Sequence, residues 1–91
     1  MKITGEELYV AWKKWVDSEE TRKTPFVIQS ETWWGDERYV LVRDIRPTPN
    51  SDSKYEVKLF NHKFRPITLF ISKAHEFEFI EDGRFKSIDW R

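Results

Sequence analysis

The first clear pattern along the chain is a series of apolar residues at the spacing of an α-helix. Residues 4–17 place apolar side chains on one face and charged side chains on the other, which predicts an amphipathic helix. Because one helix cannot bury such a face alone, we expect it to pack on a sheet. For its two Trp residues we therefore expect core packing. The apolar face consists of Leu8, Ala11, Trp12, Trp15 and Val16.

The start of this helix carries a capping signal. Thr4 and Glu7 have the spacing of a capping box, with Thr4 as the N-cap. Ile3 and Leu8 occupy the two positions of a hydrophobic staple. The helix is therefore predicted to begin just after Thr4, and the polar stretch 18–25 to end it.

Six later segments are rich in β-branched and aromatic residues and predict strands. A tight turn with Gly35 is expected between the first two segments, and residues 47–53 form a loop with two prolines. Asp82-Gly83 is a strong hairpin signal between the last two segments. The predicted strands span residues 26–34, 38–46, 54–60, 64–72, 76–81 and 84–90.

Short loops predict that the last four strands pair in series. Loops at 61–63, 73–75 and 82–83 give one consistent register, because a slip of one residue would move apolar side chains to the other face. The pairs predicted by this register are Phe60–Phe64, Val57–Ile67, Tyr55–Leu69, Ile71–Phe77, Leu69–Phe79, Glu81–Arg84, Ile80–Phe85 and Phe77–Ile88.

The register separates two faces of this predicted sheet. One face is uniformly apolar and predicts the core; it holds Tyr55, Val57, Leu59, Ile67, Leu69, Ile71, Phe77, Phe79 and Ile88. The other face mixes charged residues with Phe60, Phe64, Phe70, Ile80 and Phe85. A sheet with one solvated face would show polar residues there. Either the sheet curls so that both faces reach a core, or these five residues meet a partner.

The predicted fold is α+β. An N-terminal amphipathic helix packs on a strongly curved, barrel-like antiparallel meander of five to six strands, as one domain over residues 1–91. In a chain of this size nearly every apolar residue is needed for the core.

Composition narrows the function classes. Sixteen Lys and Arg residues balance sixteen Asp and Glu residues, which argues against a protein dominated by nucleic-acid or membrane attraction. The absence of Cys excludes disulfides and thiolate chemistry. The N-terminal residues lack the apolar core of a signal peptide, and no segment is long enough to span a bilayer. We therefore expect a cytoplasmic protein without a membrane partner.

Candidates for catalysis are weak. His62 and His75 are the only histidines and fall in turns at opposite ends of one predicted strand, which argues against a shared metal site. No Gly-rich phosphate loop is present, so we expect no cofactor and no metal. A small enzyme or enzyme subunit that uses carboxylates stays an alternative, although no catalytic residue stands out. The carboxylates in question are Glu31, Asp36, Asp44, Glu76 and Glu78.

Single-stranded nucleic-acid binding is a fuller alternative. Arg38, Arg43 and Lys58 lie on predicted strands near Phe60 and Phe64. Basic groups beside aromatic rings are how strand surfaces bind single strands. Acidic residues are mixed into the same strands, which argues against this use.

The main prediction is a non-catalytic binding or adaptor domain that contacts another protein or a second copy of itself. Aromatic residues and Arg are enriched at the centres of protein interfaces. Trp33 and Trp34 are the clearest case, because adjacent residues on a strand point to opposite faces. The predicted contact surface comprises Trp33 or Trp34, Arg38, Phe60, Phe64 and Phe70.

Overall fold

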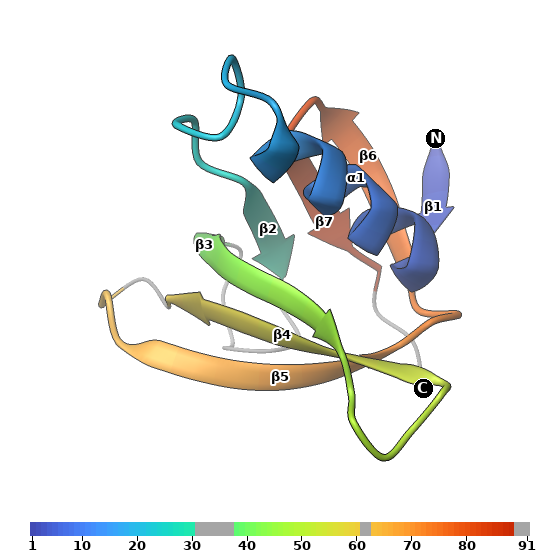
Figure 1. Ribbon diagram of the computed structural model, residues 1–91. Helices are drawn as coiled ribbons and strands as arrows, with labels where there is room; N and C mark the ends of the chain where they lie inside the picture. Colours follow the sequence, from blue (N-terminus) through green and yellow to red (C-terminus); the bar gives the residue numbers. More distant parts are fainter. Residues whose placement is uncertain (31–37, 61–62, 89–91) are drawn as a thin grey trace.

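One helix and seven strands make up the described part of the chain, residues 1–30, 38–60 and 63–88 of a computed structural model (Figure 1). The helix α1 spans Gly5–Asp17. The strands are β1 (Lys2–Thr4), β2 (Val27–Ser30), β3 (Arg38–Pro47), β4 (Lys54–Phe60), β5 (Pro66–Ser72), β6 (Glu76–Glu81) and β7 (Arg84–Ser87).

The start of α1 confirms the predicted capping box. The backbone N–H of Glu7 donates to the Thr4 hydroxyl at 3.2 Å, and the backbone N–H of Thr4 donates to the Glu7 carboxylate at 3.0 Å. Ile3 and Leu8, the predicted staple, are both buried. These contacts satisfy two backbone donors that a helix otherwise leaves without partners at its N-terminus.

All seven strands belong to one sheet, in the order β1-β6-β7-β2-β3-β4-β5. Every neighbouring pair is antiparallel except β2 and β7, which run parallel. The fold is therefore α+β with a mixed, mainly antiparallel sheet.

The prediction of a five- to six-stranded meander is wrong. The segment Lys2–Thr4 adds a strand beside β6, and β2 inserts between β7 and β3. Consecutive strands β5 and β6 do not pair, so the predicted pair Ile71–Phe77 is absent. Their connection instead lies against the start of α1, where the N–H of Glu6 donates to the Lys73 carbonyl at 3.1 Å.

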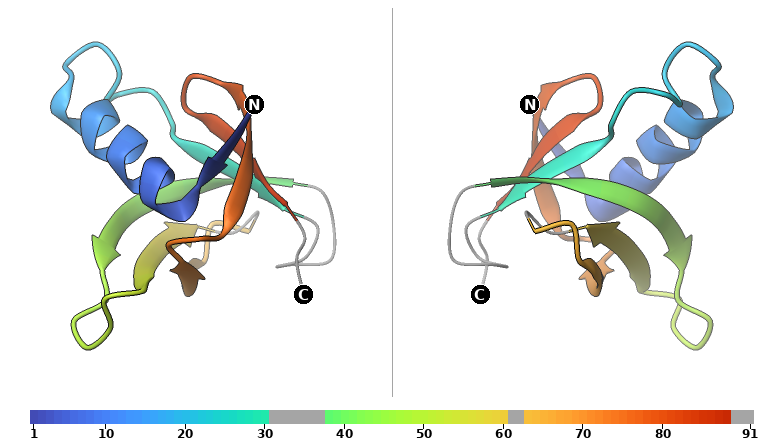
Figure 2. Two further views of the ribbon diagram at one scale, coloured as in Figure 1. Left: turned by 90° about the vertical axis from the view of Figure 1, so that its right-hand side faces the viewer. Right: turned by 90° about the vertical axis from the view of Figure 1, so that its left-hand side faces the viewer.

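The predicted barrel is also not formed. The sheet ends in two edges, β1 and β5, that are not paired to each other. Strand β3 is bent along its length, as both views of Figure 2 show, but the bend does not close the sheet. Helix α1 covers the inner face of the sheet, so the core lies between the helix and this one face of the sheet.

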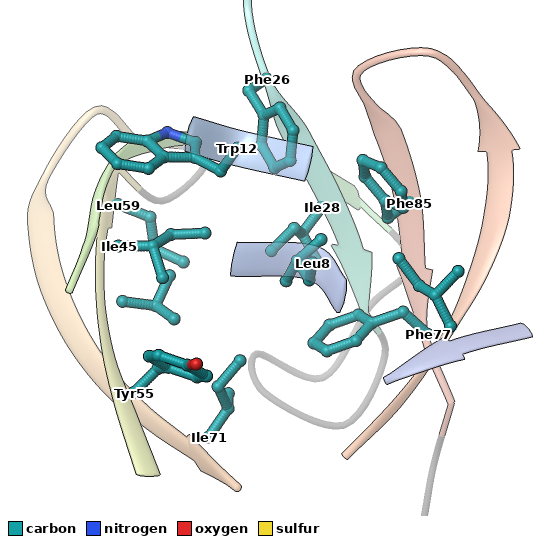
Figure 3. Packing of buried hydrophobic residues seen from close by; sticks show 12 residues of the cluster. Leu8, Trp12, Phe26, Ile28, Ile45, Tyr55, Leu59, Ile71, Phe77 and Phe85 are labelled. Carbon is teal, nitrogen blue, oxygen red and sulfur yellow. The ribbon is translucent and has the colours of Figure 1, made fainter. Parts of the chain in front are cut away.

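The core lies between α1 and the face of the sheet that the helix covers. Leu8 and Trp12 of α1 point into the same cluster as side chains from β2 to β7 (Figure 3). The predicted inner residues of β4 are all buried, which confirms the alternation assigned to that strand. The buried cluster comprises Ile3, Leu8, Trp12, Phe26, Ile28, Ile45, Tyr55, Val57, Leu59, Ile71, Phe77 and Phe85.

The pairing of β4 with β5 differs from the prediction by two residues. Val57 lies opposite Leu69 rather than Ile67, and Leu59 lies opposite Ile67. Side chains alternate with a period of two, so a shift of two residues leaves each side chain on its predicted face. The register was therefore wrong, but the division of this hairpin into two faces was right.

In the last hairpin the faces themselves change. The pair Glu81–Arg84 is found as predicted, but the register shifts between Phe79 and Glu81. Ile80 occupies this irregularity, and Phe79 rather than Ile80 lies opposite Phe85. Because a bulge adds one residue to one strand, it exchanges inside and outside beyond it. Phe85 is consequently a core residue and does not belong to the outer face.

The first predicted hairpin is described only in part. Strands β2 and β3 pair from Val27 opposite Leu41 to Ser30 opposite Arg38. The predicted turn at Gly35 and the residues Trp33 and Trp34 lie outside the described residues.

Candidate functional site

The outer face of the β4–β5 hairpin is the first candidate site. On β4, Tyr55, Val57 and Leu59 point into the core, so Glu56, Lys58 and Phe60 point outward. The outward residues lie opposite residues of β5, in the pairs Phe60–Pro66, Lys58–Thr68, Glu56–Phe70 and Lys54–Ser72. This face therefore brings Phe60 and Phe70 onto one surface with charged residues between them.

Two aromatic rings on this hairpin are left to solvent. Phe64 is 74% exposed and Phe70 is 58% exposed. Phe64 also has a backbone φ of 59°, in the left-handed region that disfavours a bulky side chain. That conformation costs on the order of 1–2 kcal/mol. The chain thus holds an apolar ring outward in a strained conformation, and such outliers cluster at functional positions.

Phe60 is partly covered by Arg43. The Arg43 guanidinium carbon lies 4.9 Å from the centre of the Phe60 ring, a cation–π contact. The register of β3 shifts between Val42 and Asp44, so Arg43 is the extra residue that turns toward the neighbouring strand. Phe60 is half-buried as a result, whereas Phe64 and Phe70 keep most of their surface exposed.

The basic groups of this face have acidic neighbours. Arg46 donates to the Asp44 carboxylate from Nε at 2.9 Å and lies 4.0 Å from Glu56. This hydrogen bond and the charge of Asp44 raise the pKa of Arg46. Lys58 lies directly opposite Asp44 on the adjacent strand. Two of the four basic residues of this face, Arg46 and Lys58, therefore lie beside an acidic residue.

The predicted contact residues fall into two groups. Arg43, Lys58, Phe60 and Phe70 lie on the outer face of β3, β4 and β5, and Phe64 lies in the connection between β4 and β5. Trp33, Trp34 and the side chain of Arg38 lie outside the described residues.

Among the described residues, strand β5 forms an edge of the sheet, which sequence reasoning missed. It is the last strand in the sheet order and the outermost strand at the bottom of Figure 1. Its seven residues, PITLFIS, include no charged side chain, in a chain where 35% of residues are charged. That uncharged run was visible in the sequence, but an edge position could not be assigned while β5 was expected to pair with β6.

A groove between α1 and the β6–β7 hairpin is the second candidate site. It has a volume of about 750 Å³, within the usual range for ligand sites. Apolar side chains line it, including Ile3, Val10, Trp15 and Phe79, and Glu7 and Lys14 also contribute. Sequence reasoning missed this groove because it depends on where the helix crosses the sheet.

His75 and Ser87 form a buried polar pair. His75 Nε2 lies 2.7 Å from Ser87 Oγ, and burial lowers the pKa of His75 to about 4. A Ser–His contact of this kind can activate a nucleophile. Both residues are more than nine-tenths buried, however, and neither lines the groove beside α1. The pair therefore has the features of a structural contact.

Metal and membrane sites find no support within the described ranges. No group of three or more His, Cys, Asp or Glu residues there could hold a metal ion. The helix found there has 13 residues, and no helix of this part is long and apolar enough to cross a bilayer.

Comparison with known proteins gives no assignment. The chain matches no protein-family model, no curated protein and no solved structure. Function must therefore be inferred from the residues themselves.

Proposed function

We propose that this chain is a non-catalytic protein-binding domain. Its contact surface is the aromatic surface formed by Phe60, Phe64 and Phe70 on the β4–β5 hairpin. The observation that carries the proposal is the exposure of Phe64 and Phe70 on one hairpin, with Phe64 held in a strained conformation.

The energetics favour a partner over permanent exposure. Burying a Phe side chain contributes about 1.5–3 kcal/mol, so two such rings supply a useful part of a binding free energy. Phe70 also belongs to the uncharged edge strand β5. An open edge can bind an extended segment by strand addition, in which backbone hydrogen bonds supply affinity and neighbouring side chains supply specificity.

Binding to peptides tests this proposal. Peptides selected on the domain from a random display library are measured by calorimetry against the wild type and against Phe64→Ser and Phe70→Ser. We expect each substitution to weaken binding at least tenfold. Ile80→Ser is the matched control, because Ile80 is also an exposed apolar residue but lies on β6, away from β5. Peptides that bind all four proteins equally would remove the aromatic surface from consideration.

Single-stranded nucleic-acid binding is the second candidate, and it rests on the stacking of Arg43 on Phe60. The acidic neighbours of Arg46 and Lys58 make it the weaker of the two. Titration with single-stranded DNA and RNA at low and moderate salt tests it. Salt-sensitive binding that weakens in Arg43→Ala and Lys58→Ala would favour this candidate, and no binding at low salt would end it.

A further inference from the structure

We propose that the partner of Phe70, on the edge strand β5, is a second copy of this chain. Two β5 strands pair antiparallel across a two-fold axis at Leu69, and this joins two seven-stranded sheets into one. The inference rests on the proposed function and specifies its partner.

The backbone of β5 offers hydrogen-bonding groups at the open edge. The N–H of Lys73 donates to the carbonyl of Ser53 at 2.9 Å, so the backbone N–H of residue 73 points toward β4 and away from the open edge. On the other side of β4, the N–H of Thr48 donates to the Lys54 carbonyl, so Lys54 faces β3 whereas its neighbour Ser53 faces β5. Along an antiparallel strand this direction alternates from residue to residue. Thr68 and Phe70 therefore direct their N–H and C=O groups toward the open edge.

Pro66 agrees with this orientation. By the same alternation its backbone nitrogen faces the open edge, where a missing N–H does not interrupt the pairing with β4. Sheets accept Pro at such edge positions.

The edge lacks most of the protection that monomeric sheets normally carry. Exposed edges are usually short, charged, interrupted by bulges or blocked by Pro, and β5 has only Pro66 at its first residue. The opposite edge β1 has three residues and includes Lys2. Strand β5 has seven residues, no charge and a regular register against β4. Its neighbour β4 carries Lys54, Glu56 and Lys58 on the same outer face, so the absence of charge is specific to the edge strand.

Both faces of the strand carry apolar side chains at this edge. Ile67 and Leu69 are only half-buried on the inner face, and Phe70 is exposed on the outer face. A strand added beside β5 would cover side chains on both sides of the sheet. An edge with polar side chains on both faces would bury little apolar surface when a strand is added beside it.

A second copy fits this edge in one register. In an antiparallel pair related by a two-fold axis, inner residues must face inner residues, so the axis passes through a residue and not between two residues. An axis at Leu69 pairs residues 67–71 of both copies and needs no hydrogen bond from the two residues that flank them. Pro66 has no N–H to donate, and the Ser72 carbonyl already accepts from the N–H of His75 at 3.0 Å and lies against Gly5. Thr68 then lies opposite Phe70 of the second copy, and the two can exchange both backbone hydrogen bonds. No like charges meet between the two β5 strands, because β5 has none, but Arg65 lies opposite Lys73 of the second copy just beyond the strand ends.

The side chains complement each other in this register. Ile67 lies opposite Ile71 of the second copy on the inner face, and Leu69 lies opposite Leu69. On the outer face, each Phe70 ring lies over Thr68 of the other copy. The two Phe70 rings are then diagonal neighbours, within reach of aromatic side chains.

Solution mass tests the association. The chain has a mass of 11.1 kDa, and we expect sedimentation equilibrium from about 1 μM to about 1 mM, spanning the usual Kd range of weak to moderate complexes, to show conversion to a dimer. Phe70→Lys should raise the dimer Kd at least tenfold, because it places a charge at the apolar seam. Ile80→Lys, with a charge at an exposed position of β6, should leave the Kd unchanged. A chain that stays monomeric over the whole range would overturn the proposal.

Cross-linking tests the register. The chain has no Cys, so a single substitution supplies the only thiol. In the Leu69-centred pair the two Leu69 residues face each other at about 4.5 Å between Cα atoms, a distance that a disulfide can span. We therefore expect Leu69→Cys to form a disulfide dimer rapidly under mild oxidation, and Ile67→Cys to form it much more slowly. Equal cross-linking of both variants, or faster cross-linking of Ile67→Cys, would overturn this dimer.

The two proposals fail separately. A monomeric chain whose peptide binding weakens in Phe70→Ser retains the proposed function and excludes the second copy as partner. A chain that neither dimerises nor binds peptides through these rings loses both.

Discussion

His75 Nε2 lies 2.7 Å from Ser87 Oγ, and this contact ties the connection between β5 and β6 to strand β7. Both residues are buried, at 5% and 7% exposure. The His75 ring also packs against the Phe77 ring, with 4.6 Å between ring centres. Burial lowers the pKa of His75 from 6.5 to about 4, although the charge of Glu76 acts in the opposite direction. The fold thus depends on a neutral imidazole.

This dependence predicts a loss of stability in mild acid. Between pH 6.5 and about 4, His75 takes up a proton in the unfolded chain but stays neutral in the folded chain. Protons therefore favour unfolding in this window, and the free energy of unfolding falls as the pH falls, by up to about 1.4 kcal/mol per pH unit. Above pH 6.5 both states are neutral, and well below pH 4 both are protonated, so this contribution is flat there. Urea unfolding at a series of pH values measures the slope.

His75→Gln is the control for this prediction. Gln carries no charge at any of these pH values and can still hydrogen-bond to Ser87. Carboxylates titrate in both proteins, so the difference between the two profiles isolates the histidine. Parallel profiles between pH 6.5 and 4 would contradict the buried neutral imidazole.

Gly5 lies against the backbone of Ser72, and this contact sets a second prediction. A methyl group at Gly5 would collide with the Ser72 carbonyl oxygen, which belongs to backbone and cannot rotate away. Ala is normally the better helix former by about 1 kcal/mol, but forcing extra atoms into a packed site costs about 1–3 kcal/mol. We therefore expect Gly5→Ala to lower the free energy of unfolding by about 1–2 kcal/mol, as measured by urea denaturation.

Lys13→Ala provides the matched comparison for Gly5→Ala. Lys13 is exposed on the same helix, so this substitution should change the free energy of unfolding by no more than about 0.5 kcal/mol. A Gly5→Ala variant as stable as the wild type would mean that α1 does not dock closely on the end of β5.

Local patterns explain what the sequence could predict. The capping box joins Thr4 to Glu7, three residues apart, and its chemistry needs no other part of the chain. The faces of β4 followed from alternation alone, so they survived a register error of two residues. The same alternation placed Phe70 on the outer face, and it is exposed; Phe64 is exposed too, but in the connection before β5 and not on the predicted strand.

Contacts between distant segments explain what the sequence could not predict. The parallel pairing of β2 with β7 joins Val27 to Arg84, and no pattern near either residue encodes it. His75 lies in the connection between β5 and β6, where a polar residue is normally solvated, but it is buried against Ser87 on β7 and Phe77 on β6. The edge position of β5 likewise follows from the position of β6 elsewhere in the sheet.

The bulge at Ile80 gives the final prediction, because it reverses the roles of two residues that the regular hairpin placed together. Phe85 is 3% exposed and packs against Phe26, with 5.1 Å between ring centres, whereas Ile80 is 44% exposed. Removing a buried Phe side chain costs about 3–5 kcal/mol, and most surface substitutions change stability by less than about 0.5 kcal/mol. We therefore expect Phe85→Ala to unfold the domain or lower its stability by several kcal/mol, and Ile80→Ala to have little effect. Thermal and urea unfolding of both variants compares them directly. Similar losses of stability in the two variants would contradict the bulge and support the regular hairpin, in which Ile80 lies opposite Phe85.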